Sequence, residues 1–242
     1  MKKTAYVTGA DRGLGLGFVK VLVENGYKVY AGSYMPDWHE LQDVVALHPE
    51  DIVTIPLDIG SDASVTAAAA VIAADTGSLN LLINNAGTVA DRGNSSTLLD
   101  ELYFDDMLAL FNVNALGTLR VSKSVIHLLL QADEKMIVSI SSAAASIGTI
   151  TRTHQYGYTM SKAAINMQSK LIYNQFHKQG LEVRAIHPGW MHTRLFGGDL
   201  ERMKDAPFEP DDAAKLVFKS IFEPLRQEDH IFTENDGTPM LY

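Results

Sequence analysis

Short apolar runs alternate along the chain with longer stretches in which apolar positions recur every three or four residues. The short runs are rich in Val and Ile and end in turn residues, which predicts strands at 4–9, 28–33, 51–59, 79–87, 135–142, 181–189 and 230–237. The longer stretches have helical periodicity, which predicts helices at 15–26, 37–49, 61–77, 100–131, 155–178 and 211–225. Residues 100–131 fit either one long helix or two joined helices.

The alternation of strand and helix determines the expected fold class. Successive parallel strands need crossover connections, and helices supply these on both faces of a sheet. Because such crossovers are right-handed, we expect an α/β fold with a single doubly wound parallel sheet of the Rossmann type. No linker-like stretch interrupts the pattern, so residues 1–242 are expected to form one domain.

Composition narrows the possible classes of partner. The chain has 29 acidic and 20 basic residues, a net charge of −9, so it lacks the cationic surplus that binds nucleic acids or anionic membranes. It has no cysteine, which excludes disulfides and thiolate metal sites. Apolar runs all fall short of the roughly 18 residues that a membrane helix needs, and no signal-peptide core follows Lys2 and Lys3. We therefore expect a cytoplasmic protein.

The first strand leads into a glycine-rich loop, TGADRGLG, at residues 8–15. Gly9 would permit the tight turn, Gly13 would let the backbone approach a phosphate, and Gly15 would allow close packing of the helix on the strand. The following helix would then point its free N–H groups at a pyrophosphate. No Gly-Lys-Ser/Thr follows, so a mononucleotide P-loop is not expected.

Several further motifs follow in order: NNAG at 84–87, NVN at 112–114, SISS at 139–142, YTMSK at 158–162 and PGWMHT at 188–193. Together with Thr8, Gly9, Gly13 and Gly15, this series resembles the short-chain dehydrogenase/reductase family over nearly the whole chain. The ending DGTPMLY is similar to that of small carbonyl-reductase-like members. The resemblance implies an NAD(P)(H)-dependent oxidoreductase that transfers hydride between nicotinamide and a ketone, aldehyde or secondary alcohol.

The resemblance also implies roles for four residues. Tyr158 would be the acid/base, and Lys162, one helical turn later, would lower the pKa of the phenol and bind the nicotinamide ribose. Ser142 would hold the substrate oxygen, and Asn114 would hold a proton-relay water against the lysine. The spacing from Ser142 to Tyr158 indicates a small insertion within 148–157, which leaves Ser141 open as the catalytic serine.

Cofactor choice depends on the end of the second strand. An NAD-selective site usually has a carboxylate there, whereas this strand ends in Ser33. Arg12 could bind a 2′-phosphate through its fork of donors, so we favour NADP over NAD. The complete set of expected cofactor-binding residues is Gly9, Asp11, Arg12, Gly13, Leu14, Gly15, Ser33, Asp58, Ile59, Asn85, Ala86, Gly87, Tyr158, Lys162, Pro188, Gly189, Met191 and Thr193.

Two other functions use a similar fold. A nucleotide-sensing regulator would bind the cofactor without turnover, but it would not need Ser142, Tyr158 and Lys162 together. A methyltransferase would need neither a Tyr–Lys pair nor NNAG. His154, His187 and His192 lack the spacing of metal ligands, so no metal is expected.

Two expectations concern larger parts of the molecule. The paired glycines in FGGD at 196–199 suggest that residues 190–207 form a substrate lid. The family resemblance implies a homodimer or homotetramer that pairs through residues 102–130 and 155–178. Apart from the cofactor and further copies of the chain, the expected partner is a small carbonyl or alcohol substrate.

Overall fold

A single parallel sheet of seven strands forms the centre of the protein. The computed structural model describes residues 2–35, 38–193, 195, 204–227 and 229–242. The strand order is β3-β2-β1-β4-β5-β6-β7, and every neighbouring pair is parallel. The strands are β1 (Thr4–Thr8), β2 (Lys28–Ser33), β3 (Ile52–Pro56), β4 (Leu81–Asn84), β5 (Lys135–Ile140), β6 (Leu181–His187) and β7 (Phe232–Glu234). The predicted doubly wound parallel sheet is confirmed.

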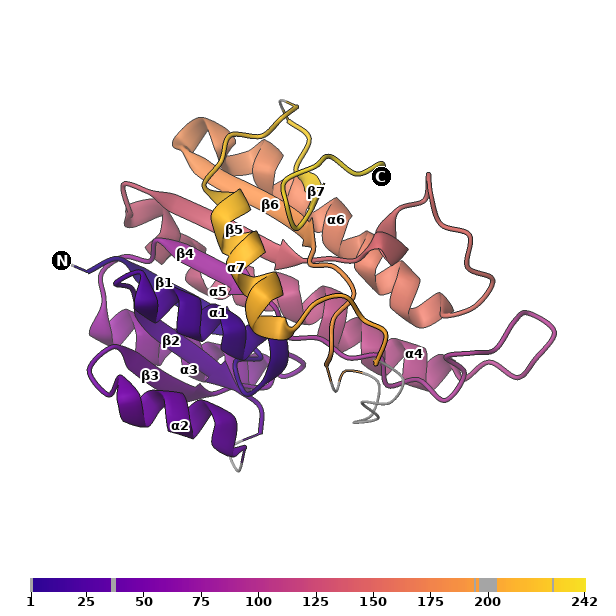
Figure 1. The fold of residues 1–242 in the computed structure, drawn as a ribbon, viewed down its shortest axis with the longest axis horizontal. Helices are drawn as coiled ribbons and strands as arrows, with labels where there is room; N and C mark the ends of the chain where they lie inside the picture. Colours follow the sequence, from indigo (N-terminus) through magenta and orange to yellow (C-terminus); the bar gives the residue numbers. More distant parts are fainter. Residues whose placement is uncertain (1, 36–37, 194, 196–203, 228) are drawn as a thin grey trace.

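Helices cover both faces of this sheet (Figure 1). One face packs against α1 (Gly13–Glu24), α2 (His39–Leu47) and α7 (Pro210–Ile221). The other packs against α3 (Asp62–Asp75), α5 (Thr118–Gln131) and α6 (Tyr156–Phe176). The strands are therefore buried on both sides, which explains their continuous apolar runs. Ser61 caps α3 by accepting a hydrogen bond from the backbone N–H of Ser64, as its position before the helix predicts.

The stretch expected as one or two helices is a continuous helical run with a distortion inside it. It comprises α4 (Phe104–Phe111), a π-helical segment (Asn112–Gly117) and α5. π-Helical turns widen the helix by one residue and often occur at functional sites. Asn114 lies in the middle of this segment.

The strand order changes direction between β1 and β4. In open α/β sheets a crevice forms at such a switch point, outside the carboxyl ends of the strands. The glycine loop leaves β1 at this edge, and the NNAG motif begins at the end of β4. The fold therefore brings together two motifs that are far apart in the sequence.

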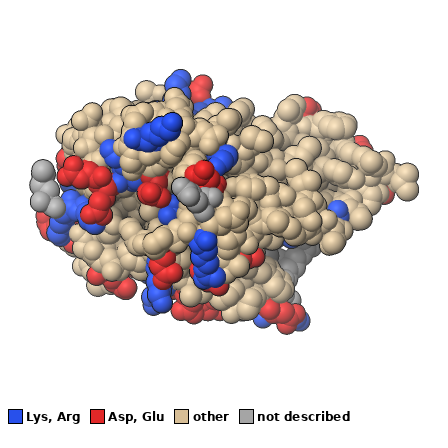
Figure 2. All heavy atoms as spheres, turned by 90° about the horizontal axis from the view of Figure 1, so that it is seen from above, with Lys and Arg blue, Asp and Glu red and all other residues tan. Residues whose placement is uncertain are grey.

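The charged side chains are intermingled in sign on the face seen in Figure 2, and one half of that face carries few charges. In the part of the chain that the structure describes, no helix combines the length and the apolar character that crossing a membrane requires.

Candidate active site and cofactor cleft

A cleft of about 1250 Å³ opens at the carboxyl ends of the strands. Its walls come from the glycine loop, the exits of β3 and β4, the end of β5, helix α6 and the segment after β6. The predicted site residues on its walls are Gly9, Asp11, Arg12, Gly13, Leu14, Gly15, Asp58, Ile59, Asn85, Ala86, Gly87, Ser142, Tyr158, Lys162, Pro188, Gly189, Met191 and Thr193. Ser33 and Asn114 are both buried behind the walls.

The glycine loop is packed as the sequence predicts. Gly9 has a φ of +64°, a left-handed conformation that favours glycine. A Cβ atom at Gly15 would lie 2.0 Å from the Gly9 carbonyl oxygen, so no side chain fits there. The side-chain amide of Asn85 donates to the carbonyl oxygens of Thr8 (3.0 Å) and Gly9 (3.1 Å). The NNAG motif thus fixes the loop at the start of α1.

The end of β2 differs from the sequence-based expectation. The hydroxyl of Ser33 donates to the carboxylate of Asp11, and the backbone N–H groups of Tyr34 and Met35 donate to the same carboxylate at 3.2 and 2.9 Å. The hydroxyl of Ser33 therefore already has a hydrogen-bond partner. A carboxylate does lie at the end of β2, although the strand itself ends in serine. The glycine loop contributes it, rather than the strand.

Arg12 extends toward the same end of β2. Its guanidinium lies 4.5 Å from the centre of the Trp38 ring and donates to the sulfur of Met35 at 2.8 Å. Arg12 is also the N-cap residue of α1, but its side chain makes no hydrogen bond to the first turn of the helix. The cationic group and the start of the helix therefore lie on one wall of the cleft.

Ser142, Tyr158 and Lys162 come together at the other end of the cleft. Ser142 follows β5, and its hydroxyl hydrogen-bonds the phenol of Tyr158. The ammonium of Lys162 lies 5.8 Å from the centre of the Tyr158 ring and donates to the carbonyl oxygen of Ile140 at 2.8 Å. All three predicted polar groups therefore share one small region.

Burial dominates the titration of these groups in the protein alone. It raises the pKa of the Tyr158 phenol, and the hydrogen bond from Ser142 and the charge of Arg152 only partly offset it. Burial also lowers the pKa of Lys162 to about 8. This differs from the expected lowering of the phenol pKa by Lys162, because desolvation of the phenol outweighs the neighbouring charges.

The two candidate serines point to different surroundings. Ser141 donates to the side-chain oxygen of Asn166 at 2.6 Å, inside the core beneath α6. Ser142 accepts from the backbone N–H of Ala144 at 3.1 Å and hydrogen-bonds the phenol of Tyr158. Of the two hydroxyls, only that of Ser142 is therefore bonded to Tyr158.

Asn114 connects the cleft to the helix behind it. Its amide donates to the carbonyl oxygen of Thr88 (2.8 Å) and to the hydroxyl of Ser161 (3.0 Å), and its oxygen accepts from the N–H of Thr88 (2.8 Å). A Cβ atom at Gly87 would lie 3.2 Å from that oxygen and 3.8 Å from the ammonium of Lys162. Asn114 therefore braces the segment after β4 against α6.

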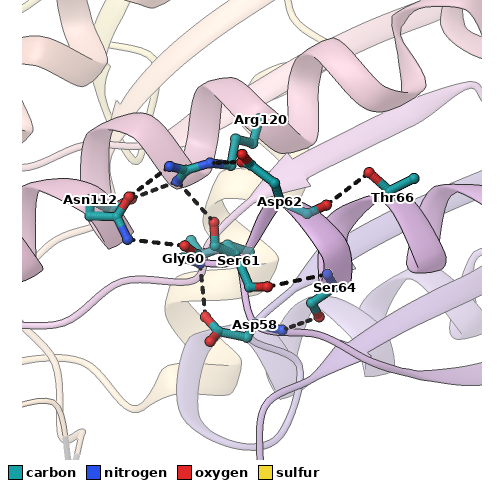
Figure 3. Close-up of polar contacts among 9 residues, drawn as sticks. Asp58, Gly60, Ser61, Asp62, Ser64, Thr66, Asn112 and Arg120 are labelled. Carbon is teal, nitrogen blue, oxygen red and sulfur yellow. Dashed lines mark hydrogen bonds and ion pairs between the residues drawn. The ribbon is translucent and has the colours of Figure 1, made fainter.

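Sequence reasoning missed a second brace, built on Asn112 and Arg120 (Figure 3). The amide of Asn112 donates to the carbonyl oxygen of Gly60 at 3.0 Å, and its side-chain oxygen accepts from Arg120 at 2.7 Å. Arg120 also pairs with Asp62 at the start of α3. Gly60 in turn donates to Asp58 at 2.8 Å. This network ties the exit of β3 to the π-helical segment.

Arg152 and His187 are further wall residues that sequence reasoning did not assign to a specific contact. Among the described residues, no group of three or more His, Asp or Glu side chains is placed to hold a metal ion. Of the expected lid at 190–207, residues 194 and 196–203 lie outside the described residues. Met191 forms a parallel bridge with Phe208, and the N–H of His192 donates to the carbonyl oxygen of Phe208 at 3.0 Å.

Comparison with known proteins identifies the family. The model of the short chain dehydrogenase family matches residues 3–204. The NADPH-bound carbonyl reductase from chicken fatty liver is 30% identical with a TM-score of 0.86, over 100% of this chain and 99% of that chain. The carbonyl reductase Sniffer of D. melanogaster has the same fold, with 24% identity, a TM-score of 0.84 and complete coverage of both chains.

A similar curated protein is an uncharacterized oxidoreductase of Schizosaccharomyces pombe, 28% identical over 99% of this chain and 98% of the relative. The match to the family model covers most of the chain, and these relatives match its full length. The resemblance seen in the sequence is therefore confirmed, and the chain belongs to the short chain dehydrogenase family of oxidoreductases.

Proposed function

We propose that this oxidoreductase reduces a ketone or aldehyde with NADPH, or carries out the reverse oxidation. The observation that carries the proposal is the meeting of Ser142, Tyr158 and Lys162 in the cleft that the glycine loop also lines. A reducible carbonyl needs a proton donor and a donor that holds its oxygen, and this arrangement supplies both.

The cofactor would supply the hydride, and the chain would provide binding and proton transfer. The start of α1 fits a pyrophosphate, because no side chain caps the N–H groups of its first turn. The preceding loop can approach the phosphates closely, because Gly9, Gly13 and Gly15 have no side chains. Lys162 would bind the ribose next to the nicotinamide. Its lowered pKa suits a group that shares a proton with the phenol.

In the proposed reduction, the Ser142 hydroxyl holds the substrate oxygen and Tyr158 gives it a proton. The raised pKa of Tyr158 keeps the phenol protonated before the reaction. The ammonium of Lys162 then stabilises the phenolate that forms. Asn114 acts as a positioning residue, since it fixes the segment beside Lys162.

NADP is the proposed cofactor, for two reasons. Arg12 lies at the end of β2, where it could pair with a 2′-phosphate, and the chicken carbonyl reductase that is 30% identical is described as NADPH-bound. The carboxylate of Asp11 at the same place opposes a phosphate. Its contacts with Ser33, Tyr34 and Met35 reduce this effect because donors already surround it.

The decisive experiment is a panel of carbonyl and alcohol substrates, assayed by nicotinamide absorbance with both cofactors. Tyr158→Phe should lower kcat by about 10²–10⁴-fold while cofactor affinity stays close to that of the parent. The matched control is Tyr156→Phe, two residues earlier in α6 and not on the wall of the cleft. Cofactor binding without turnover of any substrate would instead identify a nucleotide-sensing regulator.

We also propose a homodimer or homotetramer. Large apolar side chains stay exposed on α4, the π-helical segment, α5 and α6, namely Phe104, Leu108, Leu116, Leu119, Met160, Met167 and Leu171. A second copy of the chain would cover them. Light scattering at micromolar concentration tests this, and a monomer mass would contradict it.

A further inference from the structure

The reacting end of the cleft contains an arginine, Arg152, to which the proposed reaction assigns no direct role. Arg152 lies on the same wall as Ser142, Tyr158 and Lys162. It belongs to the connection between β5 and α6, within the segment 148–155 that precedes the helix. Acid/base chemistry at Tyr158 already has the nearby cation of Lys162, so the guanidinium of Arg152 is available for a second role.

The segment around Arg152 is held in a defined conformation. Arg152 donates to the side-chain oxygen of Gln155, a residue that is only 7% exposed. Gln155 has a φ of 68° and a ψ of 39°, a left-handed conformation that residues other than glycine rarely adopt. The segment begins at Gly148, whose N–H donates to the carbonyl oxygen of Tyr242 at 2.8 Å. The segment is therefore anchored at both ends, and Gln155 holds the exposed side chain of Arg152 by its guanidinium.

His187 provides a second, independent polar group in the same place. It lies on the wall of the cleft, and its Nδ1 is buried without a hydrogen-bond partner among the described residues. Burial and the charges of Arg152 and Lys162 lower the pKa of His187 to about 4, so the ring is neutral at physiological pH. A neutral imidazole donates through one ring nitrogen, and because Nδ1 is closed off from the cleft, Nε2 is the nitrogen that can donate to a bound oxygen.

The charge around this end of the cleft is one-sided. Between Ile140 and His187, the charged side chains on the wall are Arg152 and Lys162, and no carboxylate from these described residues accompanies them. The other wall carboxylates include Asp11, Glu40 and Asp58, which come from the exit of β1, the start of α2 and the exit of β3. On the segment after β6, the wall residue Glu209 contacts Nδ1 of His192 at 2.9 Å. In the described part of the chain, the wall at the reacting end therefore carries two cations and no carboxylate, and the buried carboxylate of Asp91 lies behind it, beside Gly157.

We infer that Arg152 and His187 bind a carboxylate on the carbonyl substrate, so that the preferred substrates are oxo acids. A guanidinium binds a carboxylate through two parallel hydrogen bonds, and the single charges of the two groups balance. Gln155 is the positioning residue that orients Arg152 toward the cleft. This inference rests on the proposed function for its reaction, but it concerns binding and can be tested separately.

The kinetic test compares an oxo acid with its ester. Benzoylformate and methyl benzoylformate have the same reacting carbonyl and differ in the charge of one group. In the parent, kcat/KM should be higher for the acid. Arg152→Gln should lower the acid-to-ester ratio of kcat/KM at least about 10-fold, the loss of one charge-assisted hydrogen bond. Using the ratio cancels any effect of Arg152 on Tyr158.

The matched control is Arg92→Gln, an arginine outside the cleft that pairs with Asp106. It should leave the acid-to-ester ratio within twofold of the parent value, roughly the scatter of surface substitutions. An equal fall of both rates in Arg152→Gln, with an unchanged ratio, would overturn the inference and assign Arg152 a structural role.

A binding experiment separates this inference from the proposed reaction. Calorimetry measures benzoylformate binding to the parent and to Arg152→Gln, both saturated with oxidised NADP, which cannot reduce the ligand. The parent should bind at least about 10-fold more tightly than the variant. Equal affinities, or binding of the ester but not of the acid, would overturn the inference. If no carbonyl compound were reduced, the proposed reaction would fail and this binding test would still decide the role of Arg152.

Discussion

The ammonium of Lys162 donates a hydrogen bond to the carbonyl oxygen of Ile140, 2.8 Å away. This contact joins helix α6 to the last residue of β5, immediately before the two candidate serines. The ammonium is therefore held in place by the sheet before any cofactor binds. A lysine fixed in this way loses little further freedom when it binds a ribose hydroxyl.

Lys162→Met keeps the aliphatic part of the side chain and removes the charge. We expect kcat/KM to fall at least about 10²-fold, because the phenolate at Tyr158 loses its neighbouring cation, and cofactor binding to weaken. Steady-state kinetics and a cofactor titration measure the two effects. Lys123→Met, at an exposed position of α5, is the control. A folded Lys162→Met protein with the kcat/KM of the parent would contradict the assignment.

Substitutions of the two neighbouring serines should affect different properties, kcat for Ser142 and stability for Ser141. Ser142→Ala should lower kcat by about 10²–10³-fold, since the substrate oxygen loses a hydrogen-bond donor. Ser141→Ala should lower the free energy of unfolding by about 1–3 kcal/mol, because the buried oxygen of Asn166 loses its donor. Kinetics and urea unfolding of both variants distinguish them. A larger loss of kcat in Ser141→Ala would reverse the assignment of the catalytic serine.

His187 should make stability depend on pH. Its pKa falls from 6.5 to about 4 on folding, so between these values the unfolded chain binds a proton that the native protein does not. The free energy of unfolding should therefore decrease as the pH drops from about 6.5 to 4, by up to about 3 kcal/mol. Urea unfolding across this range should show a shallower decrease for His187→Leu. The exposed His39→Leu is the control, and equal slopes in all three proteins would refute the prediction.

Arg12→Ala should affect the two cofactors differently. If the guanidinium pairs with a 2′-phosphate, kcat/KM should fall about 10–10²-fold with NADPH and little with NADH. Lys20→Ala is the control, since Lys20 lies on α1, the helix that Arg12 precedes, and pairs with Asp211. The assays use saturating substrate and vary each cofactor. A parent that prefers NADH, or equal losses with both cofactors, would argue against NADP.

The sequence predicted those features that depend on local spacing. These features are the glycine loop, the strand–helix alternation and the Tyr158–Lys162 pair. Each is read from residues that are close in the sequence, where the geometry follows from secondary structure. The role of Asn114 was expected only through the family resemblance. The structure shows the π-helical turn directly.

The sequence could not predict contacts that depend on where side chains point after folding. Asp11 and Ser33 are 22 residues apart, and nothing in their spacing indicates that the carboxylate turns toward β2. The same holds for Arg152, whose guanidinium donates to Gln155, a residue in the left-handed conformation. The pKa of Tyr158 was misjudged because burial, which the sequence does not quantify, outweighs the charges nearby.

The brace at Arg120 has a consequence for local unfolding. One guanidinium contacts Asp62 at the start of α3 and both the backbone and the side chain of Asn112, two residues before Asn114. The wall at the exit of β3 and the helix beside the reacting groups therefore cannot separate without breaking the same contacts. We expect amide protons around Gly60 and Asn112 to exchange with solvent in a single cooperative opening, rather than each at its own rate.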